Sequence, residues 1–356
     1  ARVLGQEGEP DVQKLRVTTE IRMQLTERRA TRTAFRKMAK DMSNRYLRQI
    51  ESFNRRRLTD FSDLLATEVA APTDKRLAEL SGRVDVVQRR VGASDAQRRE
   101  LQAKVEDYLD RSASNTGDPA LILAATTIAL ERFGKRTPQL PLDVFADEDL
   151  EPNKPITIDA SVIDGARIHL LHEGGVPYYV GFDALCDASS ENAEQFLQLA
   201  GRLVTQAETQ LVRGRQALLS ANDQHRLIRQ RSTEIIKAWD FPHHREVRAL
   251  TDAIAKQCVE RSLEGNASLG GGPNAWGIPQ EQFEALPERH PGLARVLQFA
   301  VAYNALVLKT EHSTKNQLWC LLELGGPVAV ANGLTLRRGG FLERDVRNIL
   351  AVVEAV

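Results

Sequence analysis

Two long stretches of the chain contain almost no glycine or proline and repeat apolar residues at helical spacing. In residues 12–66 these residues return at intervals near three, four and seven: Leu25, Phe35, Met38, Met42, Tyr46, Ile50 and Phe53. Residues 75–110 repeat the pattern, with a cap-like sequence, ASDAQ, at 93–97. Such spacing predicts amphipathic helices, because a helix face recurs about every 3.6 residues. We therefore expect an N-terminal helical bundle or hairpin, followed by an apolar helix over 120–133.

The composition is that of a globular protein. With 356 residues, 42% hydrophobic and 27% charged, the chain can form two or three domains. No apolar run approaches the length of a membrane span, and the N-terminus lacks the apolar core of a signal peptide, so we expect a cytoplasmic protein. The sequence does not begin with an initiator Met, so a fragment of a longer protein is an open alternative. Cys186, Cys258 and Cys320 lie far apart among apolar neighbours, which predicts buried thiols rather than a zinc site or disulfides.

The amino-acid composition changes in the middle of the chain. Residues 134–155 are rich in proline and acids and are interpreted as a linker. Three short strands are predicted after it, at 156–162, 166–172 and 177–182, divided by Asp164-Gly165 and Gly174-Gly175. A helix is then expected after Asn192, with one apolar side made of Phe196, Leu199, Ala200, Leu203, Val204, Ala207 and Leu211.

The C-terminal part predicts three helices and a small β meander. The helices are expected at 225–239, 244–263 and 291–309, with a glycine-rich loop at 266–279. Strands are expected at 318–324, 328–331 and 334–336, the last two joined by an Asn332-Gly333 hairpin turn, before a final helix at 342–355. This is the order of a winged helix. A generic α+β cap is the alternative.

The predicted fold class is therefore mainly α, with a minor β component. We expect three domains: a helical bundle with a basic helix over 1–133, a linker with short strands and a lid-like helix over 134–222, and a winged-helix-like domain over 223–356.

Motifs for catalysis are missing from the sequence. The nearest match to a phosphate-binding loop is ALERFGKRT, 129–137, but Ala129 stands where a glycine is required and a helix precedes it, so we interpret Gly134 as a helix C-cap. Arg167 and His172 have the Arg-x4-His spacing of one class of helical ribonucleases, but a strand is expected there. The histidines lack metal-ligand spacing. We expect no catalytic, cofactor-binding or metal-binding residue.

The strongest electrostatic feature is a basic stretch near the N-terminus. From Leu25 to Leu58 there are eleven Arg or Lys residues against three acids, and Arg28, Arg32 and Arg36 fall on one helical stripe. Together with Arg55, Arg56 and Arg57 they form a candidate surface for phosphate backbones. The alternative is that these cations pair with acids elsewhere, which the net charge of zero slightly favours.

Residues from about 150 to 345 resemble the C-terminal half of bacterial AAA+ ATPases of the origin-recognition (ORC/CDC) type, which are often found among phage-defence genes. SSENAEQFLQLAGRL resembles their lid helix, and LWCLLELGGPVAVANGLTLRRGGF resembles their winged-helix end. In that family an Arg after Gly-Asn-x senses the nucleotide; the aligned residues here are Glu191, Asn192, Ala193 and Glu194. A carboxylate there would repel a triphosphate. We therefore expect no ATP hydrolysis and no bound ATP unless a phosphate-binding loop lies outside these residues.

The resemblance implies a function in nucleic-acid biology. The helix over 291–309 would be the recognition helix, and Arg337, Arg338, Lys309 and Lys315 would meet phosphates around the wing. We therefore expect a non-catalytic regulatory or adaptor subunit in phage defence or genome maintenance, with DNA and a protein partner or second copy as partners and no membrane. Two alternatives remain open: the C-terminal half of an active ATPase whose phosphate-binding loop lies outside this chain, and a protein–protein scaffold.

Overall fold

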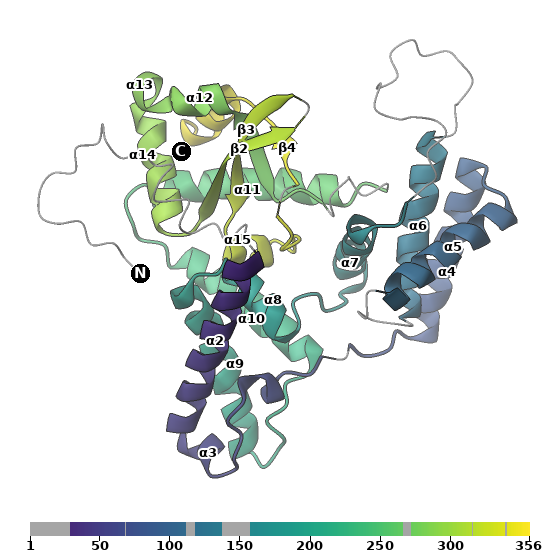
Figure 1. Ribbon diagram of the computed structural model, residues 1–356, viewed down its shortest axis with the longest axis horizontal. Helices are drawn as coiled ribbons and strands as arrows, with labels where there is room; N and C mark the ends of the chain where they lie inside the picture. The colour runs from purple at the N-terminus through teal and green to yellow at the C-terminus, as the bar shows by residue number, and fades with distance from the viewer. Residues whose placement is uncertain are drawn as a thin grey trace, which may run out of the picture. The chain divides into compact units, whose positions relative to one another are not determined.

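The computed structural model describes residues 29–67, 69–111, 118–136, 157–265, 272–314, 316–338 and 340–356. They fold as two compact units (Figure 1). The larger unit takes the described parts of Ala1–Val69, Tyr179–Cys258 and Asn274–Val356, and the smaller takes those of Ala70–Tyr178 and Val259–Pro273. Helices dominate both, and the described strands form one small mixed sheet, so the predicted fold class is confirmed.

The smaller unit contains helices α4 (Asp74–Val91), α5 (Asp95–Arg111), α6 (Pro119–Arg136) and α7 (Ala160–Gly174). α4 begins where the Thr73 hydroxyl accepts a hydrogen bond from the Arg76 N–H, and it ends at Gly92 in the left-handed region. α6 is the most apolar of these helices and contacts α4, α5 and α7. Its residues Leu121, Ala125 and Ile128 are buried in the shared core. The helices predicted over 75–110 and 120–133 are confirmed.

Helix α7 corrects two strand predictions. Residues 160–172 are helical, although strands were expected at 156–162 and 166–172. The Asp159 carboxylate caps the helix by accepting the N–H groups of Ser161 and Val162, and Gly175, at φ 64°, ends it. The helix is buried on nearly every side, so its sequence lacks the 3.6-residue periodicity of a surface helix. Residues 177–182 form no strand either, because they lead directly into α8.

Gly134 is also placed differently from its prediction as a helix C-cap. α6 continues through it to Arg136, and a Cβ atom at Gly134 would lie 2.6 Å from Val91 Cγ1. The glycine therefore permits α4 and α6 to approach closely and does not end the helix. Most of the predicted linker, residues 137–155, lies outside the described residues.

The helical part of the larger unit is formed by α2 (Arg29–Gln49), α3 (Glu51–Asn54), a short 3-10 helix, η1 (Phe61–Leu64), α8 (Gly181–Ala188), α9 (Ala193–Val212) and α10 (Ala221–Lys237). α9 starts where Asn192 accepts the N–H of Gln195, and the apolar side predicted for it is buried. α2 contacts it through an edge-on Phe35–Phe196 ring pair with centroids 6.3 Å apart. The prediction for α9 is thus confirmed.

The rest of the larger unit begins with α11 (His244–Ser262), whose residues from Val259 on are assigned to the smaller unit. It continues in the order β1 (Ala275–Pro279), α12 (Gln280–Glu284), α13 (Leu286–Arg289), α14 (Pro291–Ala302), β2 (Leu306–Thr314) and β3 (Gln317–Leu324). α15 (Gly326–Ala331), β4 (Leu342–Glu343) and α16 (Val346–Val353) complete the chain. The sheet order is β2-β3-β1-β4. β3 pairs antiparallel with both β2 and β1, and β4 is parallel to β1.

Several C-terminal predictions are wrong in detail. The helix expected over 291–309 ends at Ala302, and the rest of that range enters strand β2. Residues 328–331 belong to helix α15, and no strand forms at 334–336. Asn332 and Gly333 end that helix, with Gly333 at φ 70°. A short Val-Ala run fits a helix or a strand equally, and an Asn-Gly pair supplies the left-handed residue that either a hairpin or a helix end requires.

Candidate nucleic-acid interface

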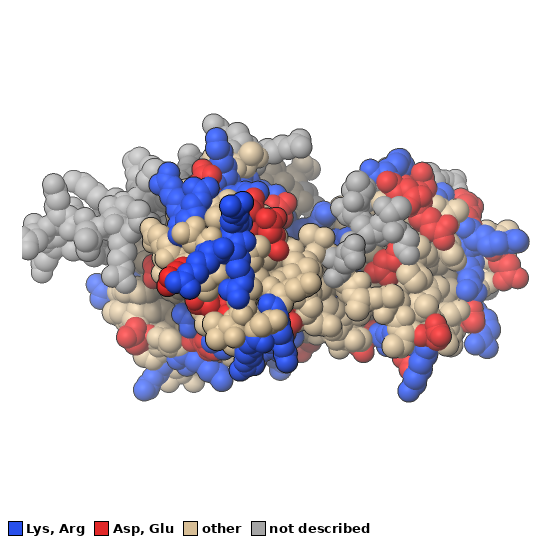
Figure 2. All heavy atoms as spheres, turned by 90° about the horizontal axis from the view of Figure 1, so that it is seen from below, with Lys and Arg blue, Asp and Glu red and all other residues tan. Residues whose placement is uncertain are grey.

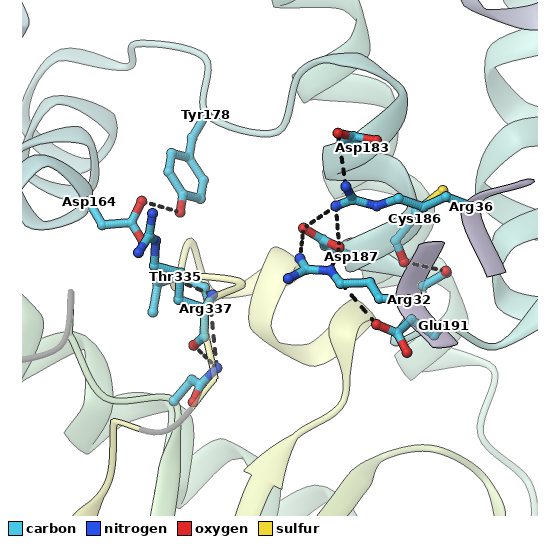
Figure 3. Close-up of polar contacts among 12 residues, drawn as sticks. Arg32, Arg36, Asp164, Tyr178, Asp183, Cys186, Asp187, Glu191, Thr335 and Arg337 are labelled. Carbon is cyan, nitrogen blue, oxygen red and sulfur yellow. Dashed lines mark hydrogen bonds and ion pairs between the residues drawn. The ribbon is translucent and has the colours of Figure 1, made fainter. Parts of the chain in front are cut away.

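Arg32 and Arg36, two cations of the predicted basic stripe, bind acids of α8 (Figure 3). Arg32 Nη2 lies 2.5 Å from Asp187 Oδ2, and Arg36 Nη2 lies 3.1 Å from Asp187 Oδ1. Arg36 Nη1 also pairs with Asp183 Oδ2 at 3.0 Å. These contacts compensate much of the positive charge of both side chains, so they fasten α2 to α8. Arg28 lies outside the described residues.

A buried carboxylate extends this charged network. Arg32 Nε is 3.9 Å from Glu191 Oε1, and the Glu191 side chain is only 8% exposed. Burial raises the pKa of the Glu191 carboxyl, while Arg338 and Arg32 offset part of the rise. Arg338 in turn lies 3.9 Å from the buried carboxylate of Glu323 on β3. Arg338 is thus engaged by acids of its own chain, which reduces its capacity to bind an external phosphate.

The turn between α8 and α9 is shaped by close backbone packing. Ser190 and Glu191 both adopt left-handed conformations, at φ 50° and 57°. The Ser190 hydroxyl accepts the N–H of Gly326 at 2.5 Å. At Gly326 a Cβ atom would lie 2.1 Å from the Ala188 carbonyl oxygen, so only glycine permits this approach of α15. Asn192 serves as a helix cap, and Glu194, at the aligned sensor position, is exposed.

The cations predicted around the β meander are dispersed. Lys309 is half-buried on β2, next to the register shift between Lys309 and His312. Arg337 is exposed after α15, where its carbonyl oxygen accepts a hydrogen bond from Asn274 Nδ2 at 2.8 Å. Lys315, between β2 and β3 in the sequence, lies outside the described residues. The sequence reasoning missed Arg295, an exposed cation on α14.

Arg55, Arg56 and Arg57 are exposed just after α3. Arg45 and Arg48 of α2, which belong to the predicted basic stretch, are exposed at the same end of the larger unit. The sequence reasoning missed Arg213 and Arg215, two exposed cations that follow α9. Both segments were visible as Arg-rich in the sequence, but nothing local indicated that α3 and α9 are neighbours.

Arg167 and His172 lie on helix α7, not on a strand. Arg167 is half-buried and His172 is exposed. Residues five apart on a helix point about 140° away from each other, since each residue turns the helix by about 100°. The two side chains therefore do not share one face of α7, and the spacing alone supports no catalytic assignment.

The described residues offer little for metal or thiol chemistry. Among them no group of three or more His, Cys, Asp or Glu residues could hold a metal ion. All three cysteines are buried and none forms a disulfide, and burial raises the pKa of the Cys186 and Cys258 thiols to about 12. A thiol with such a pKa is a poor nucleophile near neutral pH. Among the described helices, none has the length and apolarity that crossing a membrane requires.

The predicted cations therefore fall into three sets. Arg32, Arg36 and Arg338 pair with acids of the same chain, Lys309 and Arg337 are dispersed in the C-terminal part, and Arg55, Arg56 and Arg57 are exposed after α3. Comparison with known proteins adds no assignment, since no protein-family description, curated protein sequence or solved structure matches this chain.

Proposed function

We propose that this chain is a non-catalytic nucleic-acid-associated adaptor whose C-terminal part is a winged-helix module. The observation that carries the proposal is the element order helix α11, strand β1, helices α12 to α14, then the β2–β3 hairpin. A winged helix has this order, and its first strand pairs with the last strand of the hairpin. The pairing of β1 with β3, and of β3 with β2, agrees with that topology.

In this proposal α14 is the recognition helix and the β2–β3 hairpin is the wing. α14 begins at Pro291, whose ring suits the first turn of a helix, and buries Leu293, Val296 and Leu297. Its opposite side presents Arg295 and Gln298. Lys315 falls between β2 and β3 in the sequence. One cation on the helix and one on the wing suit contacts to the phosphate backbone more than extensive base readout.

In this proposal the chain derives from an ORC/CDC-type ATPase but does not bind or hydrolyse a nucleotide. Glu191 and Glu194 align with the family's nucleotide-sensing motif, and Glu191 lies in the charged network with Arg32 and Arg338. Asn192 is used as a helix cap. These roles are structural, and they support an adaptor in phage defence or genome maintenance rather than an ATPase.

Duplex DNA binding tests the proposal. Fluorescence anisotropy with a labelled duplex at increasing salt would compare the intact chain with the Arg295→Ala/Lys315→Ala variant. Loss of two phosphate contacts should reduce the slope of log K against log salt by about 1.8. The Lys75→Ala/Arg99→Ala variant, which removes two exposed cations from α4 and α5, is the matched control and should keep the slope. An unchanged slope for the first variant would count against the winged-helix contact.

A protein–protein scaffold is the second candidate, because aromatic side chains flank the proposed recognition helix. Phe241 stacks on Tyr303 with centroids 4.1 Å apart, Phe299 contacts Tyr303 and His243, and Tyr303 is 41% exposed. Aromatic residues are enriched at protein interfaces. Sedimentation that shows a stable hetero-complex, lost in Tyr303→Ala, together with no DNA affinity at low salt, would favour the scaffold.

A further inference from the structure

The end of the larger unit around α3 carries a group of seven exposed arginines, which we call the basic end: Arg45, Arg48, Arg55, Arg56, Arg57, Arg213 and Arg215. Two chain segments more than 150 residues apart contribute them. α3 contacts α9, and the Ser52 hydroxyl donates a hydrogen bond to Glu208 Oε1 at 2.8 Å. Figure 2 is seen from below, the side on which α3 lies in Figure 1, and Lys and Arg side chains are prominent on this face of the larger unit.

The basic end is poorly compensated by acids. Segments 44–58 and 207–216 contain seven arginines and two glutamates, Glu51 and Glu208. Glu51 pairs with Arg55, and Glu208 accepts the Ser52 hydroxyl. Among the described residues no ion pair engages Arg45, Arg48, Arg57, Arg213 or Arg215. Arg32 and Arg36, by contrast, share acids of α8, so charge compensation distinguishes the two ends of the same helix.

Arg57 occupies a position where glycine would fold more easily. The Leu58 N–H donates to the Phe53 carbonyl and the Arg57 N–H donates to the Asn54 carbonyl, which is the hydrogen-bond pattern of a Schellman helix end. Arg57 is the left-handed residue of this motif, at φ 57°. Glycine is the usual residue there, since it lacks the Cβ that clashes in this conformation. A strained arginine on an exposed turn indicates a role for its side chain beyond folding.

We propose that the basic end binds the phosphate backbone of a nucleic acid without reading its sequence. Every cation in the set is an arginine, whose planar guanidinium donates two parallel hydrogen bonds to a phosphate. Tyr46, 60% exposed on α2, offers a ring on which an unpaired base can stack. The isolated exposed side chains Val212 and Leu218 do not make the apolar helix face that a membrane surface requires. This surface is independent of the proposed winged helix.

Two paired substitutions test the basic end, Arg45→Gln/Arg48→Gln on α2 and Arg213→Gln/Arg215→Gln after α9. The matched control is Arg89→Gln/Arg99→Gln, which removes two exposed arginines of α4 and α5 whose Nε atoms donate to the backbone carbonyls of Asp85 and Asp95. Each variant replaces arginine by a shorter, neutral polar side chain at exposed positions only, and unchanged thermal unfolding would verify its fold. Binding to a labelled thymidine oligonucleotide and to a labelled duplex would be measured by anisotropy over a range of salt.

Each pair of substitutions at the basic end should weaken binding and lower the salt slope by about 1.8 on the duplex or about 1.4 on the single strand. The control should leave both unchanged. Equal losses in the control, an unchanged slope in both test variants, or binding only to vesicles of anionic lipid would each overturn the proposal. Arg295→Ala/Lys315→Ala separates the two surfaces, because it should leave the binding that depends on the basic end intact.

Discussion

Replacement of Arg57 by glycine should stabilise the fold while weakening nucleic-acid binding. The left-handed conformation of Arg57 costs an L-residue about 1–2 kcal/mol. Glycine avoids this cost but loses about 0.5–1 kcal/mol more backbone entropy on folding. The difference predicts a gain in unfolding free energy of about 0.5–1 kcal/mol. Arg57 is exposed and makes no ion pair among the described residues, so little side-chain stabilisation offsets the gain.

Urea unfolding followed by circular dichroism measures this gain, and Arg57→Ala is the control that removes the same charge without relieving the backbone. Arg57→Gly should unfold at a higher urea concentration than both Arg57→Ala and the unaltered chain. Both variants should remove about one phosphate contact and thus reduce the slope of log K against log salt for duplex binding by about 0.9. If Arg57→Gly is no more stable than Arg57→Ala, the reasoning about strain at this turn is refuted.

Three further predictions concern packing and pH. Gly326→Ala should cost about 1–3 kcal/mol in urea unfolding, because its Cβ would collide with the Ala188 carbonyl; an unchanged midpoint would contradict that contact. Burial lowers the pKa of His225 from 6.5 to about 4, so the unfolded chain binds a proton at this residue more readily than the folded chain. The free energy of unfolding should therefore be unaffected by His225 above pH 6.5 and should fall as the pH drops towards 4. His225→Phe should flatten that part of the pH–stability curve, and an equally steep curve would refute the assignment. The hydrogen bond from His169 and the Arg83 ion pair lower the pKa of Glu173 to about 2, so its contribution is present above pH 4.5 and lost towards pH 2; Glu173→Gln should remove that loss, which thermal melts at stepped pH would detect.

Local patterns predicted the amphipathic helices correctly because their signal lies within the helix itself. α9 is the clearest case, since Asn192 and the apolar residues at 3.6-residue spacing specify both its start and its buried side. The fold class follows from several such helices together.

Local patterns failed where burial or a shared turn signal removed the distinction between helix and strand. α7 is buried on almost all sides, so its sequence resembles a run of buried strands, and Gly174-Gly175 resembles a turn although it ends a helix. α15 was mistaken for a strand because Asn332-Gly333 can end either element. The Asp159 N-cap was the available signal for α7.

The candidate surfaces needed information that no single segment contains. Helical spacing identified Arg32 and Arg36 as one stripe, but their compensation by Asp187 depends on the contact between α2 and α8. In the same way, Arg213 and Arg215 can be assigned to the basic end only because α9 contacts α3. Each unit likewise combines segments that are far apart in the chain, which no local pattern indicates.

Salt-dependent binding of the intact chain to a labelled duplex and to a labelled single strand tests nucleic-acid association most directly. The unaltered chain should bind at low salt with affinity that falls steeply as salt rises, and the Arg45→Gln/Arg48→Gln/Arg213→Gln/Arg215→Gln variant should lower the duplex slope by about 3.6. The Arg89→Gln/Arg99→Gln control should bind as the unaltered chain does. Absence of binding by the unaltered chain at low salt would contradict the proposal that this protein contacts nucleic acid.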